Sequence, residues 1–189
     1  MAEVLPHITD EVKDFIGKQH VFFVATAPLD AEGHVNLSPK GMDSFRVLGD
    51  NEVGYIDLTG SGNETSAHIA ENGRITLMFC AFEGPSNIIR LYGEGRVILP
   101  DTDDWQGLIH KFPEHLSARQ LIIADVHRVQ TSCGYSIPFM DYKSERESLT
   151  KYWVAKGKDA LPEYHLKKNS TSIDGLATPL GRAVRDDDA

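Results

Sequence analysis

A series of short runs rich in β-branched and aromatic residues, between residues 20 and 99, most constrains how this chain can fold. Such residues favour strands, and turn-forming residues separate the runs from one another. One run, RITLMFCAF at 74–82, is apolar on both faces, as expected of a strand that is buried on both sides. We therefore expect a β-rich body with strands at 20–27, 34–38, 45–48, 53–57, 74–82, 87–99 and 121–133.

Short helices are expected around these strands. Capping residues and apolar spacing indicate helices from Thr9 or Asp10 to about Gly17, at 64–72, at 101–112, from a capping box at 144–147 to about 157, and at 162–168. Within the strand at 87–99, Gly93 and Gly95 predict a bulge or a sharp bend. Residues 169–176 (NSTSIDGL) are typical of a polar tail, and the acidic residues 186–188 of a frayed terminus.

The composition is that of a globular protein, with 41% hydrophobic and 25% charged residues among 189. We expect a single domain over residues 1–189, in which residues 140–189 form a helical C-terminal extension and polar tail. A formal charge of −9 argues against a nucleic-acid partner, because neutralising phosphates needs clustered lysine and arginine. No apolar run approaches the roughly 20 residues that span a bilayer, and the N-terminus lacks a signal pattern. We therefore expect no membrane partner and a cytoplasmic location.

Neither cysteine nor histidine spacing predicts a metal site. Cys80 and Cys133 stand far apart without CxxC spacing, so both are expected to be reduced thiols. The eight histidines form neither HExxH nor a cysteine–histidine cluster, and most are expected at the surface or at helix ends.

The segment DLTGSGNET, from Asp57 to Thr65, lies between an expected strand and an expected helix. Gly60 and Gly62 allow a sharp turn and the close approach of a ligand. Ser61, Asn63 and Thr65 would add side-chain donors at a helix N-terminus, where unpaired N–H groups and the helix dipole favour a phosphate. An ordinary turn in which Asn63 is only the helix N-cap is an equally good interpretation of these residues.

The same turn partly imitates a dinucleotide-binding fingerprint. Gly60-x-Gly62-x-x-Thr65 follows a strand, and Glu83 stands where a ribose-binding acid would be sought. However, the third glycine is a threonine, the following helix is short, and no succession of βα units surrounds it. A nicotinamide-binding Rossmann fold is therefore a weaker alternative.

Three further places carry candidate chemistry. In NLSPKG at 36–41, Lys40 follows a strand-ending proline and could meet a phosphate or an electron-rich ring. Arg90 lies inside an apolar strand, so it should face solvent, a carboxylate or a bound anion. Ser132 and Cys133 end the strand at 121–133, where a packed thiol is a more common role for a cysteine than a nucleophile.

Taken in order, the segments HVFFVATA, GHVNLSPKG, VGYIDLTGSGNETSAHIAENGRITLMF and NIIRLYGEGRV resemble the pyridoxamine 5'-phosphate oxidase-like family of FMN-binding split barrels. The resemblance covers about residues 8 to 135. Beyond residue 131, QTSCGYSIP and NSTSIDGL resemble a bacterial subgroup that is distinct from the authentic vitamin B6 oxidase. The resemblance to the split-barrel family implies a mainly β fold with flanking helices (α+β), namely a six-stranded split β-barrel. It also implies a homodimer with two FMN molecules at its interface.

The resemblance also implies site residues. The phosphate would meet the turn, the flavin ring would lie at the edge of the strand that carries SPK, and Arg90 would lie beside the site. The cofactor-binding residues that we predict are Asn36, Ser38, Pro39, Lys40, Asp57, Thr59, Ser61, Gly62, Asn63, Thr65, Arg90, Ser132 and Cys133. The sequence departs from authentic pyridoxamine phosphate oxidases where Glu64 and Thr65 replace an arginine–lysine pair of the turn, and their arginine-containing C-terminal ending is not found.

These features lead to a first hypothesis of an FMN-dependent oxidoreductase that acts on a small-molecule substrate, with no catalytic residue assigned. The flavin would supply the redox chemistry, and the protein would supply anchoring and orientation. A non-catalytic module that stores or senses flavin or haem is the alternative, because one fold serves many ligands.

Overall fold

The computed structural model describes residues 2–186. Along the chain the elements are β1 (Glu3–Leu5), α1 (Asp10–Ile16), β2 (Phe22–Thr26), β3 (Asn36–Lys40), β4 (Phe45–Val47), β5 (Glu52–Leu58), α2 (Glu64–Asn72), β6 (Arg74–Cys80), β7 (Ile88–Ile98), α3 (Asp103–Leu108), β8 (Ala118–Ser132), α4 (Ser148–Lys156), α5 (Leu161–Lys168) and α6 (Pro179–Asp186). Short 3₁₀ turns at Ile109–Lys111 and Lys158–Ala160 follow α3 and α4. The expected strands are all present, and α2 has the predicted bounds.

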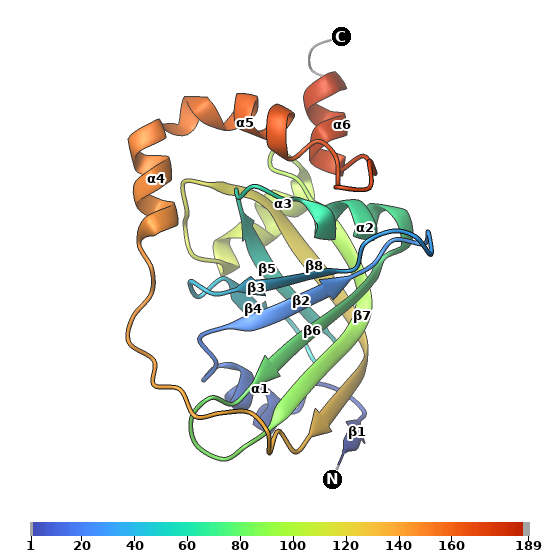
Figure 1. Ribbon diagram of the computed structural model, residues 1–189, viewed down its shortest axis with the longest axis vertical. Coiled ribbons are helices and arrows are strands. Elements are labelled where there is room, and N and C mark those ends of the chain that lie inside the picture. Colours follow the sequence, from blue (N-terminus) through green and yellow to red (C-terminus); the bar gives the residue numbers. More distant parts are fainter. Residues whose placement is uncertain (1, 187–189) are drawn as a thin grey trace.

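The strands form one curled antiparallel sheet in the order β3-β2-β6-β7-β8-β5-β4, shown in Figure 1. Every strand pair among the described residues is antiparallel. A Rossmann fold needs parallel strands joined by helical crossovers, so this topology rules out the nicotinamide alternative. The mainly β fold with flanking helices is confirmed.

The number of strands differs from the expected six. Six strands curl into the split barrel, and the three-residue strands β1 and β4 are added to it, which makes eight within residues 2–186. β1 finds a partner because β8 is 15 residues long. The first part of β8 pairs with β5, which leaves Val129–Thr131 free to pair with β1.

Apolar side chains fill the inside of the barrel. An aromatic group of Phe22, Phe45, Tyr55 and Phe79 lies at its centre, with ring centroids 4.9–5.6 Å apart. A second, smaller cluster lies on the opposite face of β5 and β8, where α3 covers it. Helix α2 contacts β2 and β7, and it ends at Gly73 in the left-handed conformation that glycine tolerates.

The C-terminal region departs most from expectation. α4 begins at Ser148, and Glu147 at its N-cap makes no side-chain capping bond, so the predicted capping box is wrong. Glu145 instead accepts a hydrogen bond from the Tyr142 hydroxyl, within an exposed segment. The tail at 169–176 is folded back by a bridge from Thr171 to Ala177 and leads into α6. Residues 187 and 188 of the expected frayed terminus lie outside the described residues.

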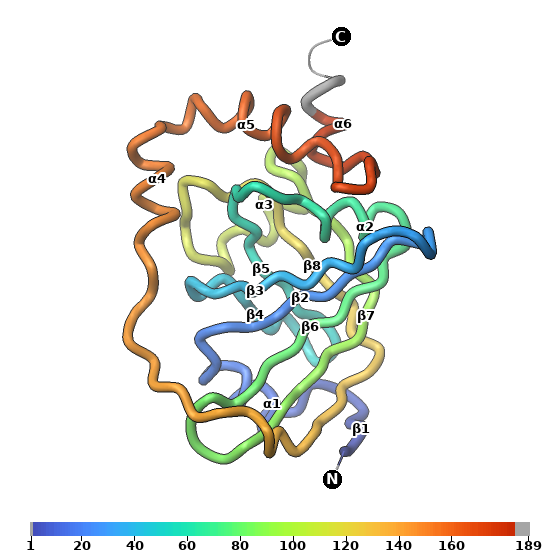
Figure 2. The backbone as a smooth tube through the Cα atoms, viewed as in Figure 1, coloured from blue at the N-terminus to red at the C-terminus, as the bar shows by residue number. Residues whose placement is uncertain are grey.

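Figure 2 shows the path of this region. The segment after β8 runs along the outside of the barrel from its lower end to α4, and the chain then crosses the upper end through α5 and α6. Helix α1 lies at the lower end. Within residues 2–186, no helix is both long and apolar enough to cross a membrane.

The irregularity predicted at Gly93 is a bulge whose extra residue, His127, lies on β8, and it gives a test of the barrel's packing. The register between β7 and β8 shifts between Tyr92 and Gly93, and a Cβ on Gly93 would lie 2.5 Å from the Asp125 carbonyl oxygen. Gly93→Ala should therefore lower the free energy of unfolding by about 1–3 kcal/mol, because the two strands must move apart. Urea unfolding measures this change.

Gly107→Ala is the matched control, since a Cβ at that helical position meets nothing within 4 Å. It should leave stability unchanged or slightly higher. An equal, small effect of both substitutions would contradict the close approach at Gly93.

Candidate functional site

The predicted residues of β3 point to opposite faces of the sheet. Asn36, Ser38 and Lys40 pair with Thr26, Val24 and Phe22 of β2, all of which are buried inside the barrel. Leu37 and Pro39 alternate with them and face outward. The predicted site residues therefore fall into two groups, one at the inner end of the barrel and one on its outer surface.

The inner group centres on the carboxylate of Asp57, which is 3% exposed. Lys40 Nζ donates to its Oδ1 at 2.8 Å, across the gap between β3 and β5. Arg119 Nε and Gln120 Nε2 both donate to its Oδ2 at 2.8 Å. Asn36 Nδ2 donates to the Thr65 hydroxyl at 2.9 Å, and this bond also crosses from β3 to α2.

Electrostatics keep Asp57 ionised. Burial alone would raise its pKa, but the positive charges of Arg119 and Lys40 and their hydrogen bonds outweigh burial and hold the pKa well below its usual value. Two cations therefore lie against one carboxylate. Arg119 is 4% exposed, and its Nη1 has no hydrogen-bond partner within residues 2–186.

The side chains predicted to hold a phosphate are mostly committed to other groups. Asn63 accepts from Gln120 Nε2 at 2.8 Å and donates to the Asn169 carbonyl at 3.1 Å. Asn63 occupies the N-cap position of α2, as predicted, but its side chain makes no capping bond to the helix. The backbone N–H groups of Glu64, Thr65 and Ser66 consequently have no acceptor among the described residues. The N-terminus of α2 therefore carries unsatisfied N–H donors, as an anion site requires, although Asn63, Thr65 and Ser66 are themselves buried.

The C-terminal region lies against the same turn. Asn169 Nδ2 donates to the Gly60 carbonyl at 2.9 Å, while its Oδ1 is buried without a partner among the described residues. Trp153 Nε1 donates to the Thr59 carbonyl at 2.9 Å, and the Ile173 N–H donates to Glu64 Oε2 at 2.9 Å. Ser61 and Gly62 remain exposed.

His165 of α5 completes this contact. The Thr59 hydroxyl donates to the Ser117 carbonyl, so its oxygen must accept from His165 Nε2 at 2.9 Å. His165 is thus the neutral tautomer with the proton on Nε2. Burial, and then the charge of Arg119, lower its pKa from 6.5 to about 4.

The outer group lies on the exposed face of the sheet. Pro39, Phe23, Met78, Arg90 and Gln130 stand in one row across five strands by register. A further contact ties this row to the end of β8, where Arg90 Nη1 donates to the Ser132 hydroxyl at 3.1 Å. Cys133 is exposed and Cys80 is buried, both as free thiols. The structure thus places Pro39 and Arg90 on one surface, apart from the inner polar group.

Sequence reasoning missed Arg119, Gln120, His165 and Asn169. The expected strand began at residue 121, which left Arg119 and Gln120 in a loop. His165 and Asn169 carry no local signal. They meet the turn through contacts 106 and 109 residues apart in the sequence.

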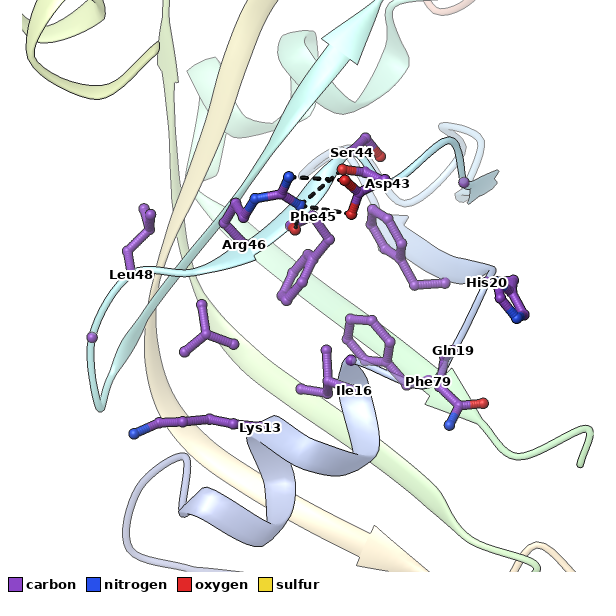
Figure 3. Close-up of a pocket in the computed structure, with 15 residues that line it drawn as sticks. Lys13, Ile16, Gln19, His20, Asp43, Ser44, Phe45, Arg46, Leu48 and Phe79 are labelled. Atoms are coloured by element: carbon purple, nitrogen blue, oxygen red, sulfur yellow. Dashed lines mark hydrogen bonds and ion pairs between the residues drawn. The ribbon is translucent and has the colours of Figure 1, made fainter. Parts of the chain in front are cut away.

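A cavity of about 510 Å³ lies elsewhere, between α1 and β4, and contains no predicted site residue. Figure 3 shows Phe45 and Phe79 within it and the Asp43–Arg46 ion pair on its wall. Arg46 also donates to the carbonyls of Lys111, Asp43 and Phe45, and it steadies a turn in which Met42 and Asp43 have positive φ. Because its charge is compensated, this wall offers no anion site.

A larger cavity, of about 1020 Å³, lies between α1, the β6–β7 loop and residues 140–142. Its wall also lacks the residues of the 57–65 turn. Neither cavity encloses the predicted cofactor site, as expected if that site lies on a surface that a second chain would complete.

Comparisons with known proteins agree with this fold. The curled antiparallel sheet with flanking helices belongs to the class of split barrels. The sequence of the pyridoxamine 5'-phosphate oxidase family matches residues 8–133, and the chain belongs to that family.

One relative is a pyridoxamine 5'-phosphate oxidase family protein, ustO of Aspergillus flavus, which is 37% identical over 198 residues, covering 95% of this chain and 78% of that protein. A HupZ structure from Group A Streptococcus superposes with a TM-score of 0.51 at 26% identity, over 66% of this chain and 99% of that one. A candidate pyridoxamine 5'-phosphate oxidase of Lactobacillus delbrueckii gives a TM-score of 0.51 at 18% identity, over 66% and 94% of the two chains, and supports the fold alone.

The residues of the turn fit an FMN phosphate, but through a set of donors that differs from the predicted one. Of the predicted side-chain donors, Asn63 is engaged within the chain, Thr65 accepts from Asn36 Nδ2, and Ser61 is exposed. The amides at the start of α2, the Ser61 and Thr65 hydroxyls and the unpaired Arg119 Nη1 are the donors that remain among the described residues. These groups favour an anion, so the donor set suits a phosphate even though the arginine–lysine pair is absent.

His165 makes stability at this site depend on pH. Because its folded pKa of about 4 lies below the ordinary 6.5, the unfolded chain binds a proton across this window and the folded chain does not. The contribution of His165 to the free energy of unfolding should therefore decline as pH falls from 6.5 to about 4. His165→Gln should flatten this part of the profile, as measured by urea unfolding at a series of pH values.

His110→Gln is the control, because His110 is exposed. Its profile should match that of the unmodified protein. If His165→Gln kept the same slope between pH 6.5 and 4, the neutral, buried state of His165 would be disproved.

Proposed function

We propose that this protein is an FMN-dependent oxidoreductase of its family. The observation that carries the proposal is the excess of positive charge at the turn: Lys40 and Arg119 lie against Asp57, beside the unsatisfied N–H groups at the start of α2. Buried charge of one sign is costly unless a counter-charge is present. A phosphate-bearing cofactor at this turn would provide that counter-charge.

The two groups of residues would then serve two parts of one flavin. The amides of Glu64, Thr65 and Ser66, with the exposed Ser61 hydroxyl, would hold the phosphate. On the outer face, Pro39 of β3 and the Arg90–Ser132 pair would orient the ring. When bound, the flavin supplies the redox chemistry. Lys40 acts indirectly, because its ammonium group is held by Asp57.

The vitamin B6 oxidase reaction is not part of the proposal. Glu64 stands where that enzyme's turn carries a cation, and it accepts a hydrogen bond from the Ile173 N–H of the C-terminal region. This arrangement uses the position to fix the chain rather than to supply a cation, and the arginine-containing C-terminal ending of the authentic oxidases is also not found. We therefore propose a different small-molecule substrate, which the flavin would reduce or oxidise.

Release of the bound cofactor tests the proposal. The protein purified from cells should carry FMN, identified by mass spectrometry after denaturation, and NADH or NADPH should bleach its yellow colour without oxygen. Reoxidation by air should restore the colour. Protein that holds FMN but resists these and other small reductants would favour the storage alternative, and a haem in place of flavin would refute the proposal.

The outer face supports a second proposal, that two copies of the chain form a homodimer around the cofactor. No helix covers this face of β3, β2 and β6 in Figure 1. Leu37 is 63% exposed on it, and Phe23 and Met78 are only partly buried. Apolar side chains gathered on an uncovered sheet suit a partner surface. A dimer would enclose the ring beside Pro39 and Arg90.

Leu37→Glu should therefore shift the protein from dimer to monomer, because a carboxylate would be buried in the interface. Sedimentation equilibrium measures the shift. Val154→Glu, on α4, is the matched control, since Val154 is 66% exposed but lies outside the sheet. A stable, FMN-loaded monomer of the unmodified protein would rule out the interfacial site.

A further inference from the structure

We propose that Arg119 is the cation that recognises the phosphate of the bound flavin, in place of the pair that the turn lacks. This inference rests on the proposed function and assigns to a single residue the selection of a phosphorylated flavin. Arg119 belongs to β8 rather than to the turn, so it lies outside the segment that the sequence singled out.

A β-bulge aims this side chain. Asp57 pairs with Gln120 and Leu58 pairs with Ala118, which leaves Arg119 as the extra residue of β8 without a partner on β5. Strict alternation would turn Arg119 away from the face that carries Gln120. A bulge redirects a side chain in this way. Its guanidinium therefore reaches the same end of the barrel as Asp57.

Two of the three guanidinium nitrogens are fixed. Nε donates to Asp57 Oδ2 and Nη2 donates to the Gly62 carbonyl, each at 2.8 Å. The bond to Gly62 places the guanidinium directly against the turn. Nη1 is buried and has no partner among the described residues. A buried guanidinium nitrogen without an acceptor is costly, and a phosphate oxygen is the acceptor that best suits it.

The charges around Arg119 also call for an anion. Asp57 is shared with Lys40, so one carboxylate faces two cations. His165 is neutral, since Arg119 helps to lower its pKa. Glu64 of the first turn of α2 adds a carboxylate at the edge of this group, where it is only partly buried and accepts a hydrogen bond from the Ile173 N–H. The group of Lys40, Asp57 and Arg119 itself has two cations and one carboxylate, and a phosphate would offset its net positive charge.

The unsatisfied N–H groups at the N-terminus of α2 are an independent observation at the same turn. Helix α2 has nine residues, its first N–H groups have no acceptor within residues 2–186, and Gly62 links the turn to Arg119. The helix dipole and the arginine would act on one anion from two elements. Backbone amides alone bind many anions weakly. The arginine would add a positive charge, which would favour a flavin with a phosphate over one without.

The test compares FMN with riboflavin, which has the same ring and polyol but no phosphate. The dissociation constants of both ligands are measured by quenching of flavin fluorescence on the apoprotein. The unmodified protein should prefer FMN. Arg119→Gln should reduce the ratio of the two constants by about tenfold to a hundredfold, because a hydrogen bond to a charged group is lost, and should leave riboflavin affinity nearly unchanged.

Arg119→Lys is the second variant, because it keeps a cation beside Asp57 and is expected to fold even if Arg119→Gln does not. A lysine cannot bond Asp57, Gly62 and a phosphate together, so it should also lose most of the preference. Arg96→Gln removes an arginine whose partners Glu52 and Asp125 lie away from the turn, and it should keep the full preference.

The outcomes separate the two proposals. A loss of preference at Arg119 but not at Arg96 supports the assignment. If Arg119→Lys weakened FMN and riboflavin equally, Arg119 would have only a structural role and the inference would fall while flavin binding stood. Equal affinity of the unmodified protein for both ligands would also overturn it. Absence of binding to either flavin would refute the proposed function itself.

Discussion

The buried carboxylate of Asp57 is the interaction on which the rest of this structure depends. It receives Lys40 from β3, Arg119 and Gln120 from β8, and lies on β5 itself. The sheet leaves β3 without a hydrogen-bonded partner on its outer edge, so a split barrel needs another link across the gap. Removing one member of a buried ion pair costs about 3–5 kcal/mol, because it leaves the other charge uncompensated. The Lys40–Asp57 bond therefore fixes both the curvature of the sheet and the position of the turn.

The same junction explains why the site can bind an anion without a cation in the turn itself. Gln120 joins Asp57 to Asn63, and Arg119 joins Asp57 to Gly62, so the turn is held from below by β8. Its side-chain oxygens are used for this support, and the helix amides are left free. A ligand that binds only the folded state adds to its stability. If a cofactor phosphate binds here as proposed, the residual positive charge would couple its binding to the closure of the barrel.

The strands, α2 and the bulge at Gly93 could be predicted because their signals are local: β-branched runs, apolar spacing and paired glycines. The resemblance to split barrels added the topology. Arg119 could not be predicted, because a bulge 62 residues from Asp57 decides where its side chain points. Lys40 was predicted to meet a phosphate or an electron-rich ring, but its ammonium group is bonded to Asp57, 17 residues away in the sequence. Sequence pattern locates donors, but only packing decides which of them remain available.

The availability of donors at the turn also depends on whether the C-terminal region is docked against it. Asn169, Trp153 and His165 all bond to residues 59–63 of the turn, so α4, α5 and the segment after them stabilise the turn in its present form. If a flavin binds while these contacts persist, docking of the region and binding of the cofactor reinforce each other. If the cofactor displaces Asn169, the two compete. In both cases linkage is reciprocal: the factor by which the docked region changes cofactor affinity equals the factor by which the cofactor changes docking. The buried, unpaired Oδ1 of Asn169 favours reinforcement, because a polyol hydroxyl of the cofactor could donate to it while the amide nitrogen stays on Gly60.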